Sequence, residues 1–172
     1  MKHIALYLSL AMAFGTGFTV TIPAAQALEQ KAIVLSWDSL LPEYELEAGG
    51  SAAAQQAVQH DLPAAQTGST DVVAELDGQF VRLPGFMLPL DYGPKGVVES
   101  FLLVPYVGAC VHVPPPPPNQ IVYVDTSTDP VKSRGMWDPI WIIGTLRTEA
   151  NINGLGNTAY TLELDRIETY EE

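Results

Sequence analysis

The fold is indicated most directly by the sequence Phe80-Val81-Arg82-Leu83-Pro84-Gly85-Phe86-Met87-Leu88-Pro89-Leu90. Its apolar content predicts a strand, but it is interrupted by two prolines and a glycine. Proline removes a donor from the hydrogen-bonding ladder, and glycine permits a bulge. We therefore expect this strand to bend, or to lie partly at a sheet edge.

Four further apolar runs follow between turn signals, at residues 97–107, 121–125, 140–146 and 160–170. In the last run Tyr160, Leu162 and Leu164 alternate with polar residues, which is typical of a strand with one solvent-exposed face. In the run before it, both faces are expected to be covered, with Trp141 packed in the core.

Five strands of which the first is long and glycine-kinked predict an all-β fold: a small OB-like five-stranded Greek-key barrel at residues 77–172. Such barrels usually carry a helix between their third and fourth strands. Residues 126–138 hold Pro130 and Gly135, so a loop is expected there instead. An immunoglobulin-like sandwich is the alternative, although it needs about seven strands.

The residues before the barrel have a different character. Residues 28–76 lack sustained alternation and are expected to form an irregular N-terminal arm and linker, with a short helix at 51–60. Residues 1–27 combine Lys2, an apolar stretch and a final Ala25-Gln26-Ala27, which together predict a signal peptide. A retained membrane anchor is the alternative. Export to the periplasm, with no stable membrane insertion after signal cleavage, is the expectation.

Charge and cysteine content exclude several classes of protein. The 172 residues carry 20 Asp and Glu against 8 Lys and Arg, a formal net charge of -12. No basic surface is therefore expected for nucleic acid. The single Cys excludes an intrachain disulfide.

One segment carries residues with metal-binding chemistry. Cys110 and His112 lie two residues apart, so on an extended backbone both side chains project from the same face. Thiolate and imidazole are ligands that zinc and copper prefer. A closed site needs one or two more ligands, for which Glu99 and Asp91 are preferred over His60 because they flank neighbouring strands.

Other interpretations of this segment stay open. A lone Cys on an apolar strand is most often a small buried apolar residue, and His112 is compatible with a hydrogen bond to a backbone carbonyl. A thiol enzyme with Cys110 as nucleophile is a third interpretation, and we do not expect an enzyme. Five prolines, 114–118, predict a stiff polyproline rod, either a connector or a docking site for a partner. Asn119 and Gln120 are expected to bond carbonyls that the rod leaves open.

Several motifs resemble those of one known family. They are Leu35-Ser36-Trp37-Asp38-Ser39-Leu40-Leu41-Pro42, residues 83–90, Phe101-Leu102-Leu103-Val104-Pro105-Tyr106, and Cys110-Val111-His112-Val113 with its prolines and Asn119-Gln120. On these motifs the chain resembles DUF3299, a family of small exported bacterial proteins of unassigned activity.

The resemblance implies an envelope protein that accompanies ABC-transporter components of the FtsX or MacB permease type, sometimes in zinc-responsive gene clusters. It implies no catalytic residues. The sequence thus leads us to expect a soluble periplasmic accessory protein that binds zinc and serves an ABC-transporter permease or a periplasmic partner. A metal-free interaction module that uses the polyproline segment is the alternative.

Overall fold

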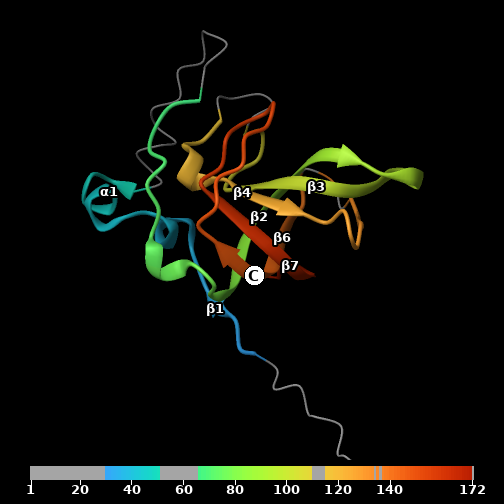
Figure 1. Ribbon diagram of the computed structural model, residues 1–172, viewed down its shortest axis with the longest axis horizontal. Helices are drawn as coiled ribbons and strands as arrows, with labels where there is room; N and C mark the ends of the chain where they lie inside the picture. The colour runs from blue at the N-terminus through green and yellow to red at the C-terminus, as the bar shows by residue number, and fades with distance from the viewer. Residues whose placement is uncertain (1–29, 51–65, 110–114, 134, 136, 172) are drawn as a thin grey trace, which may run out of the picture.

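A computed structural model of the chain describes residues 30–50, 66–109, 115–133, 135 and 137–171. These residues form seven strands, one short α-helix and several 3-10 turns. The strands are β1 (Ile33–Val34), β2 (Phe80–Tyr92), β3 (Val97–Val104), β4 (Val122–Asp125), β5 (Val131–Lys132), β6 (Pro139–Arg147) and β7 (Tyr160–Thr169). Helix α1 (Glu43–Glu47) lies on the side of the molecule opposite the β2–β3 hairpin (Figure 1).

The strands close into a barrel. Their order in the sheet is β1-β2-β6-β7-β4-β3-β5. An additional pairing of β2 with β3 closes the five strands from β2 to β3 in this order into a barrel. Strands β4 and β7 run parallel, and the other barrel pairings are antiparallel. This is the strand order of an OB-like Greek-key barrel, with β1 and β5 as additions. The predicted fold class is confirmed, and the closure by β2 and β3 excludes the sandwich.

The predicted bend in the first strand has a physical basis in its pairing. The first half of β2 pairs with β6 as far as Phe86, and the second half pairs with β3. The register shifts between Pro89 and Asp91, where the ladder is irregular. One long strand therefore contributes to both halves of the barrel, as its proline and glycine content predicted.

The main core lies inside the barrel and includes residues of the arm. Leu40 is fully buried in this core, Leu35 is nearly so, and Trp37, Val72 and Leu76 pack against it. A second apolar cluster lies on the outer face of β2 and β3. It consists of the buried residues Leu88, Leu102, Val104, Ala109 and Ile121, with Phe86, Leu90, Tyr106 and Tyr123 packed against them.

The expectation that Trp141 packs in the core is wrong. In β6 the side chains of Ile140 and Ile142 fill the core, so the residue between them faces outward. Trp141 stacks on Tyr170 with ring centroids 5.3 Å apart, and Arg82 Cζ lies 4.0 Å from the Trp141 ring centre. The indole is therefore only partly buried, under a guanidinium rather than under core side chains.

Two other expectations fall on residues that the structure does not describe, namely the signal peptide at 1–27 and the helix at 51–60. Within the described part of 126–138 the only regular element is β5, in agreement with the expected loop. None of the helices in the described ranges is both long and apolar enough to cross a bilayer.

Candidate functional site

The chain enters and leaves the Cys110 to His112 segment over one apolar surface. Ala109, directly before the segment, is 2% exposed, and Ile121, just beyond the prolines, is fully buried. Both belong to the outer cluster on β2 and β3. Cys110 and His112 themselves lie outside the described residues. The outer face of β2 and β3 therefore fixes the residues on both sides of the segment.

The described part of the proline run, residues 115–118, is packed into the protein. Pro116 and Pro118 are buried. Gln66 Nε2 donates to the carbonyl of Pro116 at 2.9 Å, and the backbone N–H of Ala159 donates to the carbonyl of Pro118 at 2.8 Å. This packing favours the interpretation of the run as a stiff connector, because it uses carbonyls that a docking rod would offer to a partner.

The backbone N–H of Gln120 donates to the carbonyl of Pro117 at 2.8 Å, as expected for a bond to the rod, but the side chains of Asn119 and Gln120 bond elsewhere. Asn119 Nδ2 donates to both carboxylate oxygens of Glu45, at 3.1 and 3.2 Å, and to the carbonyl of Asp71 at 3.1 Å. Gln120 Nε2 donates to the carbonyl of Trp37 at 2.9 Å and to that of Asn119 at 3.2 Å. Their main partners belong to the N-terminal arm, so these two buried amides hold the arm against the barrel.

The amide oxygens of these two residues, Asn119 Oδ1 and Gln120 Oε1, are buried without a hydrogen-bond partner. A buried acceptor without a donor is costly, so ordered water is the expected partner for each. Tyr160 completes this junction, because its hydroxyl accepts from Val73 N–H at 2.7 Å and donates to the carbonyl of Leu40 at 2.9 Å.

The two predicted carboxylate ligands have different surroundings. Asp91 lies opposite Ser100 in the β2–β3 ladder and accepts a hydrogen bond from Ser100 Oγ at 2.7 Å. Glu99 extends toward the hairpin turn, where a Cβ on Gly93 would lie only 2.2 Å from Glu99 Oε1. The Asp91 carboxylate is exposed at the end of β2, one residue beyond Leu90 of the outer cluster. Of the two, Asp91 is thus the one adjacent to the outer cluster that buries Ala109, the residue before Cys110.

Within the ranges that the structure describes, which omit Cys110 and His112, no three His, Cys, Asp or Glu side chains are grouped as metal ligands. Asp91 and Glu99 therefore form no site by themselves. Any metal centre that includes them depends on the thiol and the imidazole.

Sequence reasoning missed a second feature, on the outer face of β4 and β7. Tyr123 and Asp125 of β4 lie directly opposite Thr161 and Glu163 of β7. Burial is the main cause of a raised pKa at Tyr123, and the negative charge of Asp125 adds to it. Because β4 and β7 are distant in the sequence and pair in parallel, only the barrel topology brings these four side chains together.

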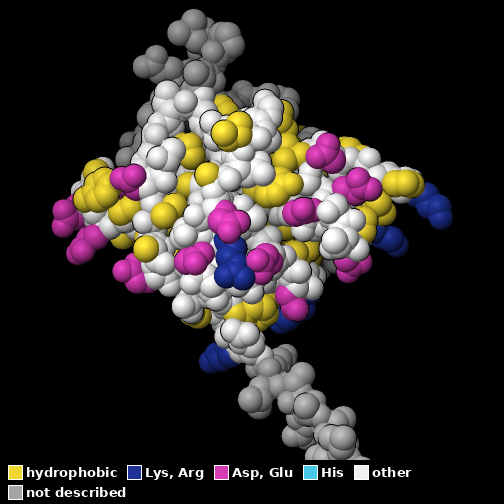
Figure 2. Space-filling view, viewed as in Figure 1, with side chains coloured by type: hydrophobic (Ala, Val, Ile, Leu, Met, Phe, Trp, Pro, Cys, Tyr) yellow, Lys and Arg dark blue, Asp and Glu magenta, His cyan; other side chains and the backbone are white. Residues whose placement is uncertain are grey.

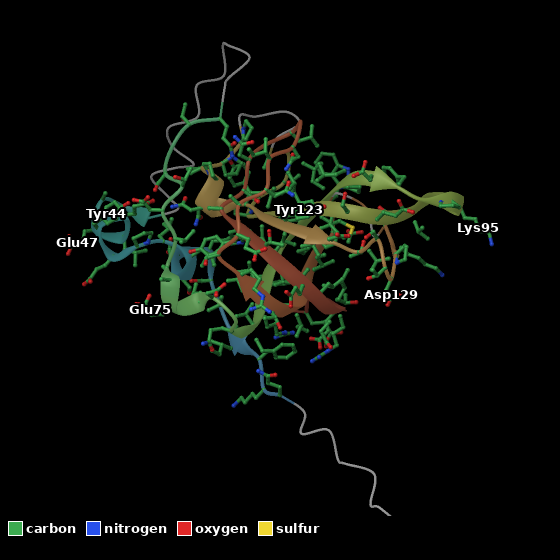
Figure 3. The ribbon with its side chains drawn as sticks, in the orientation of Figure 1. Tyr44, Glu47, Glu75, Lys95, Tyr123 and Asp129 are labelled. Atoms are coloured by element: carbon green, nitrogen blue, oxygen red, sulfur yellow. The ribbon has the colours of Figure 1, made fainter. Side chains whose placement is uncertain are left out.

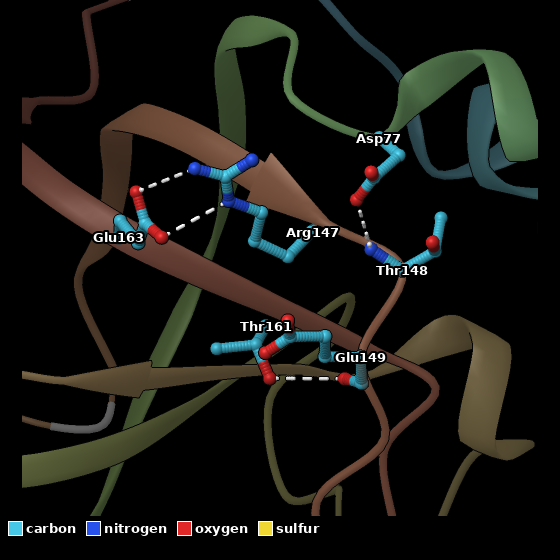
Figure 4. A network of polar contacts seen from close by, with 6 residues as sticks. All are labelled: Asp77, Arg147, Thr148, Glu149, Thr161 and Glu163. Carbon is cyan, nitrogen blue, oxygen red and sulfur yellow. Dashed lines mark hydrogen bonds and ion pairs between the residues drawn. The ribbon is translucent and has the colours of Figure 1, made fainter.

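These residues border a groove of about 480 Å³. Its wall on the side of β6 is formed by Arg147 and by Glu149 in the loop that follows. Arg147 is held by two hydrogen bonds to Glu163, from Nε at 3.0 Å and from Nη2 at 3.2 Å (Figure 4). Of the strands that border this groove, only β7 had a face that the sequence predicted to be solvent-exposed, because apolar and polar residues alternate in it.

The described residues form a closed OB-like barrel with an arm hydrogen-bonded to it and an outer apolar cluster that includes Ala109 and Ile121, in a chain of formal net charge -12. Residues 37–169 match the model of the family DUF3299, which is described as a protein of unknown function. The chain belongs to this family.

A solved structure supports the assignment. The chain is similar to a crystal structure of a DUF3299 family protein from Pseudomonas aeruginosa PAO1, with 35% sequence identity and a TM-score of 0.63. The similarity covers 83% of this chain and 99% of that one. No protein in the search of curated proteins matches the chain.

Proposed function

We propose that this protein is a periplasmic accessory protein of an ABC-type envelope transport system, without catalytic activity of its own, and that it binds zinc through Cys110 and His112. The observation that carries the proposal is the burial of Ala109 and Ile121 in one outer cluster. A metal-binding loop needs fixed ends, because each ligand that is already positioned reduces the entropy lost on binding. The zinc-associated gene context implied by the family resemblance gives further support.

Asp91 is the preferred third ligand. Its Oδ2 is occupied by Ser100 Oγ, which orients the carboxylate, and its Oδ1 remains for coordination. Zinc accepts a carboxylate oxygen beside sulfur and imidazole nitrogen. Glu99 is the second choice, since its carboxylate is directed toward the turn at Gly93.

A zinc titration of residues 28–172 against a competing chromophore tests the metal site. The wild type should bind one zinc ion, and Cys110→Ala and His112→Ala should each weaken binding at least about 100-fold. Asp91→Asn should weaken it by about 10-fold or more. Glu75→Gln, an exposed carboxylate on the arm, is the matched control and should bind as the wild type does.

Equal zinc retention by wild type and both ligand variants, or no zinc on the wild type at any loading, would refute the metal site. In that case the metal-free interaction module is the remaining function. The acidic surface of the barrel favours this second candidate, because it supplies a recognition face that needs no metal.

A further inference from the structure

The groove on the outer face of β4 and β7 is an unpartnered part of the barrel surface. Acidic side chains outnumber basic ones on the face shown in Figure 2. A second groove, of about 370 Å³, adjoins the first, since both are lined by Asp125, Thr128 and Leu164. The second groove adds Asp129 and the cations Lys132 and Arg166, of which Arg166 is paired with Asp165 at 2.7 Å. Among the described residues that line the two grooves, five carboxylates stand against three cations, so the lining is net negative. Together the two grooves form an elongated surface rather than a compact pocket.

Arg147, the one cation among the described residues that line the first groove, is already paired, and so is the hydroxyl of Thr161. Arg147 donates to Glu163, and Thr161 Oγ1 donates to the backbone carbonyl of Glu149 at 3.0 Å. Next to the groove lining, the backbone N–H of Thr148 donates to Asp77 Oδ1 at 3.0 Å (Figure 4). A ligand rich in acceptors, such as a phosphate or a sulfate, would therefore find no free charged donor on this wall.

The acceptors remain available. Asp125 uses only Oδ1, which accepts from the N–H of Ser127 at 2.8 Å. The Glu149 side chain is exposed, and its carboxylate has no hydrogen-bond partner among the described residues. Carboxylates in this state form their strongest hydrogen bonds with ammonium and guanidinium groups. The groove thus offers negative charge and acceptors to a ligand that supplies positive charge and donors.

We propose that this face docks an extended basic segment, rich in Lys or Arg, of a protein partner. The inference builds on the proposed accessory role, because it specifies the chemistry of the partner that this role requires. A free polyamine shares the ammonium chemistry, and the test below separates it from a protein segment. A basic protein segment fits both the charge and the elongated shape.

The test measures binding of fluorescein-labelled hexalysine to residues 28–172 by fluorescence anisotropy. The groove variant is Asp125→Asn with Glu149→Gln. The control variant is Glu43→Gln with Glu47→Gln on helix α1, which changes net charge by the same amount. Figure 3 shows Glu47 at one edge of the molecule and Asp129, which lines the second groove, toward the other. Non-specific attraction to an acidic protein would therefore weaken equally in both variants, whereas docking in the groove would not.

The groove variant should bind hexalysine about 5- to 10-fold more weakly than the wild type, and the control less than about 2-fold more weakly. Spermine should compete only weakly. Equal losses in the two variants, no measurable hexalysine binding, or spermine binding as tight as that of hexalysine would each overturn the proposal. Zinc binding should be unchanged in the groove variant, so this test and the metal test fail independently.

Discussion

At the scale of single residues, one buried hydroxyl carries much of the attachment between arm and barrel. Tyr160→Phe removes the hydroxyl that accepts from the Val73 N–H and donates to the Leu40 carbonyl. Leaving buried backbone groups unpaired costs about 1–3 kcal/mol, so we expect a loss of that size in the free energy of unfolding. Urea denaturation measures it. Tyr92→Phe, on a side chain that is 61% exposed, should change stability by less than about 0.5 kcal/mol.

The same tyrosine makes a prediction about pH. Burial raises the pKa of Tyr160 above the ordinary value of 10.0, and the hydrogen bond from Val73 partly offsets this. The folded protein therefore keeps the phenolic proton at a pH where the unfolded chain loses it. The stability that this group contributes is complete below pH 10 and is lost as pH rises through the folded pKa. Between about pH 9 and pH 11 the fall in stability should be shallower for Tyr160→Phe. Identical slopes would contradict the assignment.

At the scale of elements, the β6–β7 ladder depends on a close approach of two backbones. A Cβ on Gly144 would lie 2.1 Å from the Glu163 carbonyl oxygen, next to the register shift between Ile143 and Gly144. Gly144→Ala must push the strands apart, so it should destabilise the protein by about 1–3 kcal/mol. Gly154→Ala is the matched control, since a Cβ there meets nothing within 4 Å. If thermal unfolding gave the same decrease in Tm for both variants, the two backbones would be able to separate at little cost in free energy.

The proline connector gives a second prediction at this scale. Gln66 ties it to the loop before β7, donating to the carbonyls of Pro116 and Asn157 and accepting from the Asn157 N–H at 2.7 Å. Gln66→Glu keeps the shape but cannot donate to two carbonyls. We expect a loss of about 1–3 kcal/mol and faster proteolysis in the loop at 148–159. Wild-type proteolysis rates in the variant would indicate that the connector is held by packing alone.

The elements also show what the sequence can predict. Each of the five predicted strands corresponds to a strand of the barrel, because apolar runs and turn residues are local signals. The second ends at Val104 rather than at 107, where Pro105 interrupts the ladder. The two-residue strand β1 was not predicted, since it exists only through its pairing with β2.

The two candidate sites also differ in whether the local sequence can predict them. Cys110 and His112 stand out in the sequence because their residue types carry chemistry at a fixed spacing. The facing of Asp125 and Glu163, by contrast, follows from the parallel register of β4 and β7. The local order of apolar and polar residues does not indicate such long-range pairing. It also does not indicate whether Trp141 points into the core or away from it.

At the scale of the whole molecule, the formal charge of -12 opposes the compact state through self-repulsion. The ion pairs are too exposed to offset it, as the Arg147 and Glu163 side chains show with 35% and 61% exposure. Salt shortens the Debye length to about 10 Å at 0.1 M and screens this repulsion. We therefore expect the free energy of unfolding to rise by about 1 kcal/mol, and the Tm by about 2–4 °C, when NaCl is raised from about 10 to 300 mM. The increase should disappear near the sequence pI of 4.4, where net charge vanishes. A Tm that falls with salt at neutral pH would mean that local ion pairs outweigh the global repulsion.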